Sequence, residues 1–141
     1  MASLATTATQ TENDETQIRN IISEMANMNG SQNPGRQHMA DSCLFIRPSG
    51  NPLTMEAWDQ MMNSEDVTMT GSSLVSVNKL EVDGNMAYAC YTTHSKFNYK
   101  GNENDDIAVF TGVFQKRNGK WQLVHGQRST GRTPDQDLPR F

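Results

Sequence analysis

Cysteine is scarce in this chain of 141 residues, and long apolar runs are missing. Its two cysteines, Cys43 and Cys90, each lie in an apolar stretch, whereas a disulfide framework needs more cysteines and a secretory signal. We therefore predict buried free thiols and a reducing, cytoplasmic setting. No stretch approaches the ~20 apolar residues of a membrane span, so we predict no membrane partner.

Basic residues are also few. Twelve Lys and Arg stand against sixteen Asp and Glu, for a formal net charge of −4. A nucleic-acid-binding surface needs clustered positive charge, and the basic residues that do cluster, within 116–120, flank a turn dipeptide. The sequence therefore predicts no nucleic-acid partner.

Three segments are predicted along the chain. Residues 1–13 lack the basic and apolar regions of a signal peptide, and their Ala, Thr and Ser bias favours a disordered lead. Residues 14–131 have the length of one domain. Residues 132–141 are polar and contain two prolines, so we expect an extended tail.

The first half of the chain predicts two amphipathic helices. Apolar residues recur at helical spacing over 18–25, with Asn13 or Asp14 as the N-cap, and again over 53–64, which carries Trp58. Between them, "CLFIRPSGNP" predicts a short strand that Pro48 stops.

From Val67 onward the apolar period changes to two. Four blocks rich in Val, Thr, Tyr and Phe span residues 67–84, 85–101, 105–119 and 120–131. Asp83-Gly84 and Asn118-Gly119 predict tight hairpin turns, and "YKGNENDD" a longer loop. The predicted fold class is α+β, with N-terminal helices packed on a curved antiparallel meander.

This order of elements, closed by "GKWQLVHGQRSTG", resembles the nuclear-transport-factor-2-like (NTF2-like) superfamily, which includes SnoaL-like polyketide cyclases and ketosteroid isomerase. The last hairpin is most similar to the association domain of calcium/calmodulin-dependent protein kinase II, through residues 119–122, 124–125 and 128–129. The resemblance covers residues 14–131 and implies a cone whose concave face and helices enclose a pocket. In kinase association domains, arginines from adjacent strands line that pocket, and here Arg128 alone stands where the resemblance expects one.

Arg128 is therefore the leading candidate for ligand binding. Strict alternation from Trp121 sets its facing opposite to that of His125, and the resemblance makes this facing inward. An interior guanidinium needs an anionic ligand or an acidic partner, since an unpaired buried charge is very costly. Three readings stay open: a pocket role, a structural ion pair with Asp41 or Glu56, and plain exposure.

Further candidates follow from the pocket that the resemblance implies. Besides Arg128, the ligand-binding candidates are Tyr91, Thr93, Ser129 and Trp58. The candidates for general acid–base catalysis are Asp41, Tyr91, His94 and His125. The histidines and carboxylates lack the spacing of metal ligands, so we predict neither a metal nor a cofactor.

Three functions remain open. The first is a SnoaL-like pocket protein for a small organic or anionic ligand, and the second is a non-catalytic assembly module like the kinase association domain. The third is a metal-free carbonic anhydrase like those of the iota class, although "HGQRS" departs from that family's last strand. Because "IAVFTGVF" is apolar on both faces, we also expect a homodimer built on the sheet.

Overall fold

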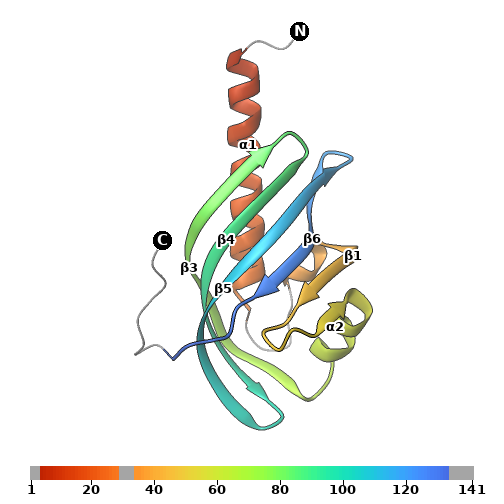
Figure 1. Ribbon diagram of the computed structural model, residues 1–141, viewed down its shortest axis with the longest axis vertical. Helices are drawn as coiled ribbons and strands as arrows, with labels where there is room; N and C mark the ends of the chain where they lie inside the picture. The colour runs from red at the N-terminus through yellow and green to blue at the C-terminus, as the bar shows by residue number, and fades with distance from the viewer. Residues whose placement is uncertain (1–3, 29–33, 134–141) are drawn as a thin grey trace.

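The computed structural model describes residues 4–28 and 34–133 and has the predicted α+β architecture (Figure 1). The first elements are α1 (Leu4–Ala26), the short 3-10 helix η1 (Pro34–His38), β1 (Met39–Ile46), β2 (Pro52–Thr54) and α2 (Met55–Met62). Four long strands follow: β3 (Val67–Asp83), β4 (Met86–Tyr99), β5 (Asn102–Arg117) and β6 (Lys120–Arg128).

All six strands form one sheet in the order β2-β1-β6-β5-β4-β3. The predicted antiparallel meander is confirmed, because β3 to β6 pair consecutively. The short strand β1 extends the sheet on the far side of β6 and runs parallel to it. This arrangement brings the first strand of the chain beside the last, which the sequence pattern did not predict.

Three two-residue turns connect the meander. Asn118-Gly119 forms the predicted turn, with both residues at positive φ. The first turn is shifted by one residue: its central pair is Gly84-Asn85, and only Gly84 has positive φ. The long loop predicted at "YKGNENDD" is wrong, since Lys100-Gly101 makes a tight turn and β5 begins at Asn102.

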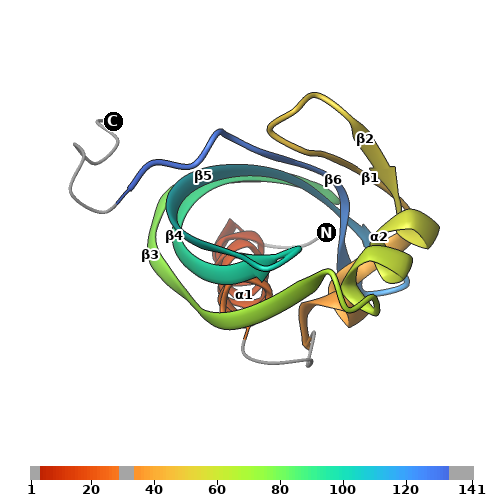
Figure 2. The same ribbon diagram turned by 90° about the horizontal axis from the view of Figure 1, so that it is seen from below.

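The sheet curves because four residues stand outside the pairing as β-bulges. Thr70, Val75 and Asn78 are the extra residues on β3, and Val124 is the extra residue on β6. A bulge bends its strand and increases the local twist. Figure 2 shows the result, with the long strands curling around α1.

The bulge at Val124 corrects the predicted alternation on β6. Trp121 and Leu123 are buried, and a Cβ on Gly126 would touch Leu123 and Phe45, so all three positions face the core. Because one residue is skipped between Leu123 and Gly126, Arg128 faces the same side as Trp121. The prediction that Arg128 faces inward therefore agrees with the structure, but the strict alternation behind it was wrong.

Helix α1 begins earlier than expected. Residues 4–13, assigned to a disordered lead, are helical, and the helix extends past the end of the sheet (Figure 1). Residues 1–3 of that lead, and residues 134–141 of the expected tail, lie outside the described residues. No helix in the described part of the chain combines the length and the apolar character that crossing a membrane requires.

Asp14 is therefore not an N-cap but a buried residue within α1, 4% exposed. Its Oδ1 accepts hydrogen bonds from Trp121 Nε1 and Lys116 Nζ, both at 3.0 Å, and from Gln10 Nε2 at 3.2 Å. Burial by itself raises the pKa of Asp14, but these three donors outweigh it and hold the pKa below its ordinary value. This carboxylate fastens α1 to the last hairpin.

The two cysteines are free. Cys43 is buried, and burial raises the pKa of its thiol to about 11, while Cys90 is only partly buried. Cys43 belongs to the main core with Trp121, Phe114 and Leu123. Both thiols are therefore protonated near neutral pH, and neither is an activated nucleophile.

Candidate functional site

The inner face of the curved sheet, closed by the helices, surrounds a cavity of about 590 Å³. Its wall draws on α1, β1, the β1–β2 turn, α2 and β3 to β6. Most lining side chains are apolar, and the charged ones are Arg47 and Arg128. A cavity of this size with a few polar groups is typical of a small-molecule site.

Arg128 lies on the cavity wall and also makes a structural contact. Its NH2 lies 3.3 Å from Asp106 Oδ2, and its guanidinium carbon lies 5.9 Å from the centre of the Phe110 ring. The predicted ion-pair partners, Asp41 and Glu56, are therefore incorrect, and the real partner comes from the neighbouring strand. Arg128 thus both lines the cavity and forms an ion pair within the fold.

Arg47 supplies a second guanidinium to the same cavity. It follows Ile46, the last residue of β1, which pairs with Gln127, the residue before Arg128 on β6, and both arginines line the cavity. Unlike Arg128, Arg47 has no carboxylate partner within the described residues, and its Nε is buried without a hydrogen bond. Of the two guanidinium groups that line the cavity, only that of Arg128 is paired with a carboxylate, which leaves the positive charge of Arg47 for an anion.

Sequence reasoning missed Arg47, although a signal was present. Cys43 and Phe45 are buried on β1, and alternation continues this facing to Arg47. The signal was weak, because Pro48 and Gly50 follow directly and suggest an exposed turn.

Trp58 contributes a further unpaired donor. It lies on α2, whose N-cap Thr54 accepts a hydrogen bond from Ala57 N at 3.2 Å and so sets where the helix begins. The indole lines the cavity and packs edge-on against Phe45, with 5.2 Å between ring centres. Its Nε1 is buried without a hydrogen-bond partner.

The predicted inner face of β4 carries the remaining polar groups. Tyr91, Thr93 and Ser95 all line the cavity and are buried. Thr93 Oγ1 and Ser95 Oγ are 3.2 Å apart, and Ser95 Oγ lies 3.4 Å from Ser72 Oγ on β3. Tyr91 stacks on Phe110, and burial, with a smaller effect from Cys43, raises its pKa well above the ordinary value. Tyr91 therefore stays a neutral phenol.

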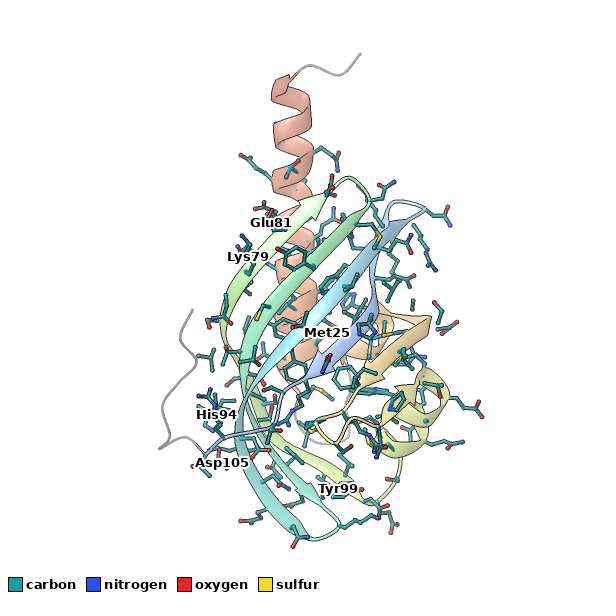
Figure 3. All side chains as sticks on the ribbon, viewed as in Figure 1. Met25, Lys79, Glu81, His94, Tyr99 and Asp105 are labelled. Carbon is teal, nitrogen blue, oxygen red and sulfur yellow. The ribbon has the colours of Figure 1, made fainter. Side chains whose placement is uncertain are left out.

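Four predicted site residues lie outside the cavity. Asp41 is fully exposed and pairs with Arg36 at 3.4 Å. His94 is paired with Asp105 along the outer curve of the strands (Figure 3). His125 faces outward, opposite in facing to Gly126, and Ser129 is exposed, with its hydroxyl accepting from Val109 N. Of the four acid–base candidates, only Tyr91 lines the cavity.

Within the described ranges, no three His, Cys, Asp or Glu side chains gather closely enough to hold a metal ion. The polar side-chain groups among the described lining residues are guanidinium, indole, hydroxyl and, at Asn51, carboxamide groups. All of these can donate hydrogen bonds, and none of them is an anion.

Comparisons with known proteins agree with this fold. A family model described as "Protein of unknown function (DUF3804)" matches residues 13–138. An NTF2-like protein of unknown function from Prochlorococcus marinus is 34% identical, with a TM-score of 0.75, over 84% of this chain and 94% of that one. No curated protein matches the sequence.

Two more distant structures share the fold alone. A calcium/calmodulin-dependent kinase II association-domain-like protein from Exiguobacterium sibiricum is 15% identical, with a TM-score of 0.64, over 96% of this chain and 98% of that one. A ketosteroid isomerase-like protein from Erwinia carotovora atroseptica is 14% identical, with a TM-score of 0.59, over 72% of this chain and 81% of that one.

Proposed function

The chain belongs to the DUF3804 family and to the NTF2-like superfamily, and we propose that it binds a small organic anion, with a carboxylate as the recognised group, in its central cavity. The observation that carries the proposal is the pair of arginines, Arg47 and Arg128, on the wall of one largely apolar cavity, where Arg47 has no ion-pair partner among the described residues. A partly buried guanidinium without a counter-ion is costly, and an anionic ligand that pairs with it offsets that cost.

Charge favours an anion over a neutral acceptor. Arg128 has Asp106, whereas Arg47 has no ion-pair partner in the described chain. A guanidinium fork matches the two oxygens of a carboxylate, and a largely apolar wall strengthens the interaction.

The same composition favours binding over proton transfer. No Asp, Glu, His or Lys is found among the described residues that line the cavity. The phenol of Tyr91, with its raised pKa, can donate a hydrogen bond but is a poor base at neutral pH. The described cavity wall therefore lacks the carboxylate base that such isomerase chemistry requires.

The test compares Arg47→Met with Arg128→Lys and with the exposed control Arg117→Lys. Calorimetry and thermal melting are measured with and without a panel of carboxylates. We expect Arg47→Met to weaken binding about tenfold or more, the value of one charge-assisted hydrogen bond.

Without ligand, Arg47→Met should keep or raise the thermal midpoint, because it removes a buried unpaired donor. A lowered midpoint together with unchanged anion binding would contradict the proposal and make Arg47 architectural. Arg128→Lys should weaken binding and also destabilise the free protein, because Arg128 holds Asp106 as well.

Hydration of CO2 without a metal is the second candidate, favoured by the hydroxyls of Thr93, Ser95 and Ser72 beside Tyr91. These groups could hold a water against a small substrate. A CO2 hydration assay in the presence of a chelator tests this reading, and Thr93→Val serves as the matched variant. No rate above buffer would exclude it.

A further inference from the structure

The cavity is elongated along β4. Every inward residue from Tyr91 to Tyr99 lines it, and these residues span roughly 26 Å of extended strand. Arg128 belongs to the Tyr91 end, because Phe110 pairs with both Arg128 and Tyr91. In Figure 3, Met25 lies near the middle of the sheet and Tyr99 near its lower end, and both residues belong to the wall. The cationic groups thus occupy one end of a long cavity.

The remainder of the wall carries adaptable methionine side chains on one side and rigid aromatic rings on the other. Six of the nine methionines line the cavity, mostly from the helical side: Met25, Met28, Met39, Met61, Met62 and Met69. Aromatic rings from the strands face them, and two of these rings, Tyr91 and Phe110, are stacked with 5.3 Å between their centres. Unbranched thioether side chains adapt to irregular apolar shapes, whereas packed rings hold one position.

The hydroxyl groups that line the cavity between its two ends do not need a polar group of the ligand as a hydrogen-bond partner. Ser95 lies within hydrogen-bond distance of both Thr93 and Ser72, so these side chains satisfy one another. Beyond them, towards Tyr99, the residues of β3 and β4 that line the cavity are Val67, Met69 and Phe97. An apolar chain can therefore pass over the hydroxyls without leaving one unpaired.

From this polarity along one axis we infer that the ligand is an amphipathic monocarboxylate of the fatty-acid class. Its carboxylate binds at Arg47 and Arg128, and its hydrocarbon chain runs between the methionines and the aromatic rings towards Tyr99. The inference rests on the proposed function and adds the chemical class of the ligand's body.

A homologous series of straight-chain acids, from butanoate to hexadecanoate, tests the inference with the full chain by calorimetry below the aggregation limit of each acid. Each added methylene should tighten binding about fourfold until the cavity is filled, from the ~0.8 kcal/mol gained per buried CH2. The methyl esters, which lack the charge, should bind more weakly than the acids at every length.

Two variants locate the two ends of the ligand. Arg47→Met should weaken all acids by the same factor and leave the esters unchanged. Met69→Gln, at the far end, should weaken the long acids and leave the short ones unchanged, and Met86→Gln, 42% exposed on the outer face, is the matched control. Circular dichroism checks that each variant is folded.

The outcomes distinguish a failure of the fatty-acid class from a failure of the proposed anion site. Acids that all bind equally, with Arg47 still required, would overturn the fatty-acid class and keep the anion site. Acids that do not bind at any length, or esters that bind as tightly as acids, would overturn the proposed function itself.

Discussion

Replacing Asp14 with Ala should destabilise the fold, because it removes the polar contact between α1 and the last hairpin. Its carboxylate is 4% exposed and joins α1 to both strands of the last hairpin, through Lys116 on β5 and Trp121 on β6. Truncation leaves the buried indole N–H and the ammonium without an acceptor.

The magnitude follows from these two orphaned donors. Breaking a buried ion pair by removing one partner costs about 3–5 kcal/mol. The Lys116 side chain retains 20% exposure and can turn towards water, which favours the lower end of this range. We therefore expect a loss of about 3 kcal/mol, or a thermal midpoint lower by roughly 10 °C for a domain of this size.

Lowering the pH should remove the stabilisation by the Asp14 carboxylate in the wild type. Because the folded pKa of Asp14 lies below its unfolded value, its stabilisation is fully present above about pH 4. It is lost as the pH falls through the lowered folded pKa. Asp14→Asn keeps an acceptor for Trp121 but cannot ionise, so the stability gap between wild type and Asp14→Asn should close in acid.

Urea unfolding followed by Trp fluorescence, from pH 7 down to pH 3, measures both effects. Lys116→Met serves as the second arm of a double-mutant cycle, and its coupling energy with Asp14→Asn isolates the ion pair. A loss below about 1 kcal/mol for Asp14→Ala, in a protein that still unfolds cooperatively, would refute the anchoring role.

Two further predictions concern the sheet. One row across the outer face of the sheet consists of Leu44, His125, Val113 and Tyr88. Two of its apolar side chains, Leu44 and Tyr88, are 37% and 46% exposed. We therefore expect a homodimer on this face. Val113→Glu should give a monomer in light scattering, and a monomeric wild type would count against the dimer. Gly126→Ala should cost about 1–3 kcal/mol in chemical unfolding, because the new Cβ would lie 2.9 Å from Phe45 Cδ2; an unchanged stability would mean that Phe45 gives way freely.

The sequence alone determined the type and order of the main helices and long strands, and one of the three hairpin turns. Period-two patterning placed the four long strands, since side chains alternate between the faces of any strand whatever its neighbours are. Asn118-Gly119 specified its own turn, because positive φ at both positions is a local property of the backbone. The sequence of the last hairpin was also similar enough to that of the kinase association domain to indicate the NTF2-like superfamily.

Tertiary structure alone decided which face of the sheet the residues beyond the bulges point to. It also decided which distant side chains the polar residues contact. Skipping Val124 reverses the alternation on β6, and a single extra residue leaves no periodic trace in a strand of nine residues. Asp14 followed the pattern of a capping residue, and its role as an anchor depends on side chains more than a hundred positions away. Arg47 and Arg128 come to line one cavity because β1 lies parallel to β6, a long-range pairing that no local pattern encodes.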